Sequence, residues 1–290
     1  MRKYFLAITL LVITSCDVND SSKEQKPEPQ QQIEKQILPD IYEQRKSIYN
    51  SFMDLADTIY RITGNDEVGR IVEFLKKNSI VITLDSECLP IPKTSPELAV
   101  FPVLASDFCP EVLEIKKRRF FLAFFNALAR TLVIKGGEKL SWLSKGLVFL
   151  HEGSHALSFH QGNYSLYDIE SQVKEEIRVY NLEDKILLSI GGQPFADLLE
   201  KAATQIESNV SRHGIQYLEQ FNSVWDSMDK YEDRLSKIFG LSYDFEEEGV
   251  FWKSKFFISS VFYFFEKKYT GTKSTSDLKV NFIKNLPKDY

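Results

Sequence analysis

Residues 142–159 strongly constrain how this chain can fold, because the segment is apolar around its whole helical circumference yet contains two histidines. Its apolar residues are Leu143, Leu147, Val148, Phe149, Leu150, Ala156, Leu157 and Phe159. A helix that is apolar on all sides is expected to be buried. Ser141 or Ser144 can cap its start, and Gly162 can end it. Polar side chains inside such a helix need partners, since unpaired burial is costly.

The polar residues of this helix form the motif HExxH, His151-Glu152-Gly153-Ser154-His155. Positions four apart share one helix face, so both imidazoles can bind one metal ion. Glu152 can then reach water bound beside the metal and act as its general base. The chain has only 4 His, and chance would produce the motif on the order of 0.005 times in this length. The motif therefore predicts a zinc site.

Gly153 lies inside the predicted helix, where glycine costs about 1 kcal/mol relative to alanine. A residue without a side chain lets another element approach closely. We therefore expect a second helix or strand to pack against this position.

At these residues the chain resembles the zincin metallopeptidases, through His151, Glu152, His155 and their buried helical setting. The resemblance implies zinc as cofactor and peptides or proteins as substrates. It also implies an α+β fold, predominantly helical, with a helical C-terminal lobe. Zincins place an edge strand beside the active-site helix to pair with the substrate, and Thr131–Ile134 is the candidate for that strand.

Zinc in a hydrolase usually takes three protein ligands and one water, so a third ligand is needed. The metzincin pattern would require Gly at 158 and His at 161, where this chain has Ser158 and Gln161. His160 lies five residues beyond His155, away from the ligating face. The metzincin pattern is therefore absent, and His160 is a less favoured candidate than the acidic residues of the next helix.

The segment 169–190 reads as the next helix, and it offers several acidic candidates. Glu176 falls near the middle of the apolar face, where a carboxylate requires a partner. The stretch Glu176–Tyr180 also resembles the third-ligand pattern of the gluzincins, with Val179 in place of a small residue. Glu176 is therefore the favoured ligand. The alternatives that stay open are Glu175, at the spacing of thermolysin-like enzymes, Glu183, Glu170, Asp168, and a site without a third protein ligand.

The first residues read as a bacterial lipoprotein signal, with Arg2-Lys3 before an apolar stretch of about ten residues, half of a membrane span. Ile13-Thr14-Ser15-Cys16 resembles a lipobox, which makes Cys16 the predicted site of lipid attachment. Residues 17–39 are polar and are expected to form a tether. The predicted location is the cell envelope, on a membrane through the lipid anchor.

Residues 40–290 are expected to form the metallopeptidase domain, and Cys88 and Cys109 lie within it. An exported protein meets an oxidising compartment, which favours a disulfide between them over two buried thiols. The formal net charge is −5 and the basic residues are scattered, so nucleic-acid binding has little support.

Outside the motif, the pattern predicts mainly helices, at 41–62, 66–77, 195–210, 215–239 and 249–269. Residues 80–84 read as a strand, and the apolar stretch 120–134 fits either a helix or a strand. The apolar run 256–265 is too short to cross a membrane and is predicted to be a core helix.

The predicted function is zinc-dependent hydrolysis of peptide bonds, with Glu152 as general base. Tyr243 and His213 are candidates for stabilising the developing oxyanion. A different class of function stays open, namely a zincin-like lipoprotein that has lost catalysis and acts as a binding or scaffold module. A site with an open coordination position favours the enzyme.

Overall fold

Helices make up most of the described part of the protein. The computed structural model describes residues 47–78, 81–84, 123–126, 131–134, 139–163, 165, 168–242 and 246–286. These residues all belong to one unit of the chain, Arg45–Tyr290. The predicted signal and lipobox at 1–16, the tether at 17–39, and Cys16, Cys88, Cys109 and Tyr243 lie outside the described residues.

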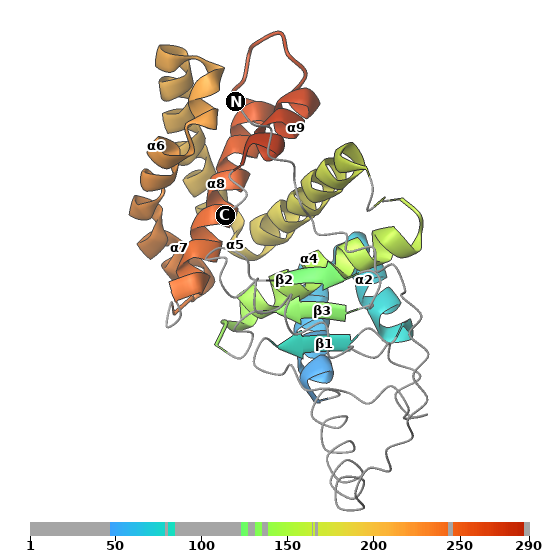
Figure 1. Ribbon diagram of the computed structural model, residues 1–290. Coiled ribbons are helices and arrows are strands. Elements are labelled where there is room, and N and C mark those ends of the chain that lie inside the picture. Colours follow the sequence, from blue (N-terminus) through green and yellow to red (C-terminus); the bar gives the residue numbers. More distant parts are fainter. Residues whose placement is uncertain are drawn as a thin grey trace, which may run out of the picture. The chain divides into compact units, whose positions relative to one another are not determined.

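The first described element is a helix at 47–63 and the last is α9, with the larger elements labelled in Figure 1. The elements after the first helix are α2 (Asp66–Lys77), β1 (Val81–Leu84), β2 (Ala123–Asn126), β3 (Thr131–Ile134), α4 (Trp142–His160), α5 (Ile169–His213), η2 (Ile215–Glu219), α6 (Phe221–Asp226), η3 (Asp229–Tyr231), α7 (Glu232–Phe239), α8 (Glu246–Lys267) and α9 (Thr275–Asn285).

The three described strands form one small sheet in the order β1-β3-β2. β1 pairs with β3 in parallel and β2 pairs with β3 antiparallel, so Ile134 is flanked by Leu84 and Ala123. The strand predicted at 80–84 is confirmed, and the ambiguous stretch 120–134 contains two strands. The edge-strand prediction for Thr131–Ile134 is wrong, because β3 is the central strand and both of its backbone edges are paired.

The predicted limits of α4 are confirmed. Ser141 is its N-cap and its hydroxyl accepts from the backbone N–H of Ser144, whereas the carboxylate of Glu248 on α8 accepts from the N–H of Ser141 at 3.1 Å. The helix ends at His160 with Gln161 as its C-cap, and Gly162 follows with a φ of 72°. α4 packs against α2, α5, β2 and β3, and this explains why it needs an apolar surface in every direction.

The close approach expected at Gly153 is made by α2. A Cβ atom at this position would lie 2.8 Å from Cδ1 of Leu75 and 3.2 Å from Cγ2 of Ile71. Both side chains are fully buried, so neither can move away freely. The absence of a side chain at 153 thus sets the distance between α2 and the helix that carries the histidines.

We expect Gly153→Ala to lower the free energy of unfolding by about 1–3 kcal/mol, because overpacking at the α2–α4 contact outweighs the gain in helix propensity. Chemical denaturation of the two proteins measures the change. A variant as stable as wild type would show that α2 can shift outward at little cost.

The helices predicted at 169–190 and 195–210 are present as the two parts of α5. Gly192 interrupts the helical backbone with φ 56° and ψ −148°, and Pro194 follows it. The helix predicted at 215–239 is wrong as one continuous element, since η2, α6, η3 and α7 divide it. Residues between these short elements, such as Gln220 and Ser227, interrupt the helix although the apolar periodicity continues across them.

Helix α8, the last but one of the described helices, is a core element, as predicted for residues 256–265. Phe256, Phe257, Phe262 and Phe265 are each at most 2% exposed, and α8 makes its most extensive contacts with α5. Within the described residues, the model contains no helix with the length and apolar character required to cross a membrane. The packing of α8 on α5 brings a C-terminal segment next to the helix that carries Glu176.

Candidate metal centre

His151 and His155 lie one turn apart on α4 and face α5. Their ring centroids are 4.8 Å apart. The Nε2 atom of His151 is 3.5 Å from Oε2 of Glu176, and the Nε2 atom of His155 is 3.3 Å from Oε1 of the same carboxylate. One potential ligand atom from each of the three residues lies within 4.8 Å of the other two. The structure therefore brings together the two histidines of the motif and the favoured third residue.

The three side chains differ in exposure. His151 and His155 are 12% and 9% exposed, whereas Glu176 retains 38% of its side-chain surface. Among the residues that the structure describes, the group comprises these three side chains and no fourth potential ligand. A tetrahedral ion held by three protein ligands has one coordination position left for water or substrate.

The second nitrogen of each imidazole faces its own carboxylate. Nδ1 of His151 lies 3.0 Å from Oε1 of Glu183, and Nδ1 of His155 lies 3.3 Å from Oε1 of Glu175. A carboxylate on Nδ1 favours the tautomer with the proton on that nitrogen, which leaves the Nε2 lone pair for a metal ion. Glu175 and Glu183, two of the alternative third ligands, thus contact the Nδ1 atoms, whereas Glu176 is near the Nε2 atoms.

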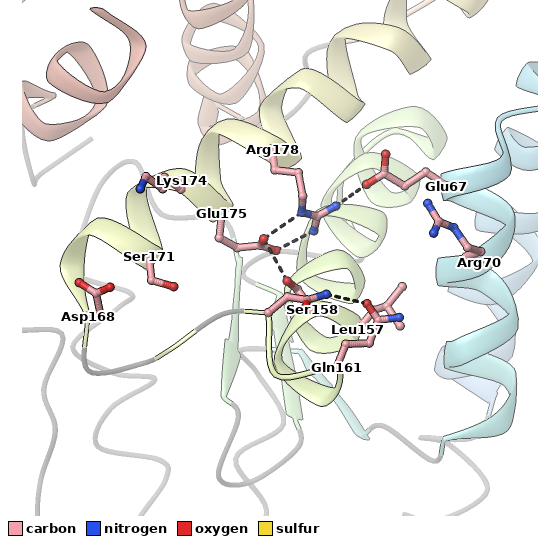
Figure 2. Close-up of a pocket in the computed structure, with 11 residues that line it drawn as sticks. Glu67, Arg70, Leu157, Ser158, Gln161, Asp168, Ser171, Lys174, Glu175 and Arg178 are labelled. Carbon is pink, nitrogen blue, oxygen red and sulfur yellow. Dashed lines mark hydrogen bonds and ion pairs between the residues drawn. The ribbon is translucent and has the colours of Figure 1, made fainter. Parts of the chain in front are cut away.

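Two basic side chains hold these outer carboxylates. Arg178 bonds both oxygens of Glu175, with Nε 2.8 Å from Oε2 and Nη2 2.6 Å from Oε1, and also pairs with Glu67 on α2 (Figure 2). Lys255 on α8 pairs with Glu183. The Nδ1 atom of each imidazole therefore contacts a carboxylate, and each of these carboxylates forms an ion pair with a basic side chain.

The charges in the cluster favour protonated imidazole rings on His151 and His155 and an ionised carboxylate on Glu176. Burial disfavours the charged ring of His155, but Glu176 and Glu175 outweigh this and raise its pKa to about 10. The pKa of His151 is also raised, because Glu183 and Glu176 together outweigh burial and the repulsion of Lys255. Burial raises the pKa of Glu176, but the two imidazoles reverse the effect and hold it well below its usual value.

Glu152 is buried next to the cluster without belonging to it. The residue is 6% exposed. Burial raises the pKa of its carboxyl group, and the neighbouring His151 and His155 offset only part of the increase. A carboxylate with a raised pKa accepts a proton more readily, which is the property that a general base near neutral pH requires.

Tyr180 is a neighbour of the cluster that the sequence analysis did not single out as a functional side chain. Its ring packs edge-on against His151 at 5.5 Å between centroids, and the ammonium of Lys255 lies 4.6 Å from its centre. Burial and the charges of Glu176, Glu183 and Glu152 raise its pKa well above 10. The hydroxyl is therefore a neutral group at physiological pH. Its place one turn after Glu176 was the available signal.

The other predicted candidates lie elsewhere. His160 is exposed and its ring packs on Phe74. Asp168 caps α5 by accepting from the N–H of Glu170 at 3.1 Å, and the side chain of Glu170 pairs with Lys174 at 2.9 Å. His213 is the last residue of α5, stacked on Tyr217. The structure brings none of these residues into the cluster.

A cavity of about 600 Å³ is lined in part by Glu175, the residue whose carboxylate contacts Nδ1 of His155 (Figure 2). Arg178, which donates to the carboxylate of Glu175, also lines the cavity. Its other charged and polar lining residues include Glu67, Arg70, Ser158 and Gln161. The cavity is on the Nδ1 side of His155, away from the Nε2 atoms that converge on Glu176.

Comparisons of this chain with models of known families, with curated proteins and with solved structures give no match.

Proposed function

We propose that this protein is a zinc-dependent peptidase of zincin-like α+β type, with His151, His155 and Glu176 as metal ligands and Glu152 as general base. The observation that carries the proposal is the convergence of two Nε2 atoms on one carboxylate, while both Nδ1 atoms face other carboxylates. This arrangement supports the proposal, because the Nε2 atoms lie on one side of the rings and the acceptors for Nδ1–H lie on the other.

The donor set fits zinc. Two imidazole nitrogens and one carboxylate are the ligand combination of zinc peptidases, and softer ions would favour sulfur. When bound, zinc supplies a Lewis acid that activates water and polarises a carbonyl group. The side chain of Glu176 is 38% exposed, which favours an open site over the alternative of a filled, scaffolding one.

Glu152 supplies the proton chemistry in this proposal. Its carboxylate takes a proton from the attacking water and delivers it to the nitrogen of the leaving amine. Burial and the raised pKa suit it to hold that proton between the two steps. Tyr180 and Lys255 lie next to His151 and line the same buried region.

The test is digestion of a peptide library by the purified protein, followed by mass spectrometry. We expect cleavage that a chelator abolishes and that one equivalent of zinc restores. The scaffold alternative predicts a protein that binds zinc and cleaves no peptide in the library. Cleavage that persists after the metal has been removed would contradict the proposal.

Zinc affinity is expected to rise with pH, because each imidazole must lose its Nε2 proton before it binds the ion. With the pKa of His155 near 10 in the metal-free state, affinity should increase up to about 10-fold per pH unit between pH 7 and 9. Calorimetry in buffers with different ionisation enthalpies should detect at least about one proton released per zinc. Binding independent of pH and without proton release would rule out these histidines as ligands.

The same pKa shift predicts how the metal-free protein responds to pH. His155 has its pKa raised in the folded state, so its contribution to stability is full below about 6.5 and is lost as the pH rises towards 10. With zinc bound, the folded state should not lose this stability as the pH rises, because the metal cation takes the place of the proton on His155.

The proposed location is the cell envelope, with lipid attached at Cys16 and residues 17–39 as tether. We expect Cys16→Ser to move the protein from the membrane fraction to the soluble fraction, because the acyl chains supply about 0.8 kcal/mol per buried methylene. Fractionation and immunoblotting of the two proteins measure the change. A variant that stays with membranes after a high-salt wash would contradict anchoring by lipid.

A further inference from the structure

We propose that Lys255 and Arg178 are positioning residues of the metal centre. Each holds a carboxylate that in turn holds one histidine, so that the two rings present Nε2 to the same point. The inference rests on the proposed function, and it adds the roles of two residues that touch neither the ion nor the substrate. It also assigns helix α8 a direct part in forming the site.

The first chain of contacts runs from α2 through α5 to His155. The guanidinium of Arg178 donates hydrogen bonds to both carboxylate oxygens of Glu175. It also donates to Oγ of Ser154 at 2.6 Å and forms an ion pair with Glu67. Glu175 then contacts Nδ1 of His155 with the oxygen that Nη2 holds. A planar guanidinium bound at both carboxylate oxygens fixes the plane of that carboxylate as well as its position.

The second chain of contacts runs from α8 through α5 to His151. Lys255 is 8% exposed and pairs with Oε2 of Glu183, whose side chain is 3% exposed. The other oxygen of Glu183 is 3.0 Å from Nδ1 of His151. Two buried charges in contact are stable together, and removal of one leaves the other uncompensated.

Lys255 must be paired with Glu183 for His151 to bind a metal ion. The ammonium also lies 3.4 Å from Nδ1 of His151 and could donate to it. In that case the ring proton would be on Nε2, where it would block the ligand lone pair. Glu183 prevents this by accepting from Lys255 with one oxygen and from Nδ1–H with the other.

The two chains are separate in sequence and in the elements they connect. Arg178 is three residues from Glu175 on the same helix, whereas Lys255 and Glu183 are 72 residues apart. Partners of this kind typically change metal affinity by about 10- to 100-fold when they are removed. Because they act through ligand orientation, their loss must also change the ligand field of the bound ion.

The experiment uses the full-length protein with Zn²⁺ and Co²⁺ as probes. Lys255→Met and Arg178→Met are compared with Lys253→Met and Lys174→Met, which remove a lysine from the same two helices. Lys253 pairs with Asp229 and Lys174 with Glu170, both outside the centre. Zinc affinity is measured by competition with a chromophoric chelator, and the visible absorption of bound Co²⁺ reports the coordination geometry.

We expect Lys255→Met and Arg178→Met to bind zinc about 10- to 100-fold more weakly, with a changed Co²⁺ spectrum. The two control variants should behave as wild type. Lys255→Arg should restore part of the affinity and the spectrum, because a cation again meets Glu183.

Two outcomes overturn the positioning role. One is zinc affinity and Co²⁺ spectra in both test variants equal to those of wild type. The other is lower thermal stability of the metal-free variants with an unchanged Co²⁺ spectrum in the folded fraction, which would mean that the residues only stabilise the fold. A wild-type protein that binds neither ion would instead overturn the proposed function on which the inference rests.

Discussion

Replacing Glu152 with glutamine is expected to reduce peptide hydrolysis roughly 10²- to 10⁴-fold and to leave zinc content unchanged. The amide is close in size to the carboxylate, so the buried site can accept it with little rearrangement. Glu152 lies outside the group of three ligand atoms, so the metal keeps its ligands. The variant loses only the ability to accept the proton of the attacking water.

The matched control for this variant is Glu170→Gln, an exposed residue paired with Lys174 near the start of α5. It should cleave the peptide library at the wild-type rate. Equal rates and products for wild type and Glu152→Gln would assign the activity to a contaminant or to another site. A fall in zinc content together with activity would instead indicate that Glu152 supports the ligands.

Replacing Glu176 with alanine is expected to weaken zinc binding by more than about 100-fold, the upper end of the effect of a residue that only supports a ligand. Glu175→Ala should stay within about 10- to 100-fold, because Glu175 contacts Nδ1 of His155 and not the converging Nε2 atoms. Both changes remove a carboxylate from the same helix, so they control for each other in charge. Competition with a chromophoric chelator measures the ranking.

The opposite ranking would make Glu175 the ligand and Glu176 the supporting carboxylate. The metal would then lie on the Nδ1 side of His155, next to Arg178 and the polar cavity. An arginine bonded to the ligand carboxylate would compete with the ion for its oxygens. The geometry therefore disfavours that arrangement, and the comparison of the two variants tests it directly.

The motif and helical periodicity are enough to predict which three side chains the structure brings together. They put His151 and His155 on one face of one helix and Glu176 in the apolar face of the next, because residues three and four apart share a face. The sequence also predicted the ends of α4 from Ser141 and Gly162, whose capping chemistry is local. The need for close packing at Gly153 followed from the cost of glycine in a helix.

The partners of the histidines could not be predicted in the same way. Glu175 and Glu183 lie on the same helix as Glu176, and periodicity alone does not tell a ligand from an acceptor for Nδ1. Lys255 contributes from a helix 104 residues after His151, and only tertiary packing shows that it meets the site. The position of β3 in the sheet likewise depends on its pairing with β1 and β2, which a single strand pattern does not contain.

Elemental analysis of the purified protein tests most directly whether His151, His155 and Glu176 hold one zinc ion. Samples of wild type and of His151→Ala/His155→Ala are prepared without chelator, and circular dichroism verifies that both are folded. We predict about one zinc per chain in the wild type and none above background in the double variant. A folded wild-type protein without zinc, or a double variant that retains it, would contradict the assignment.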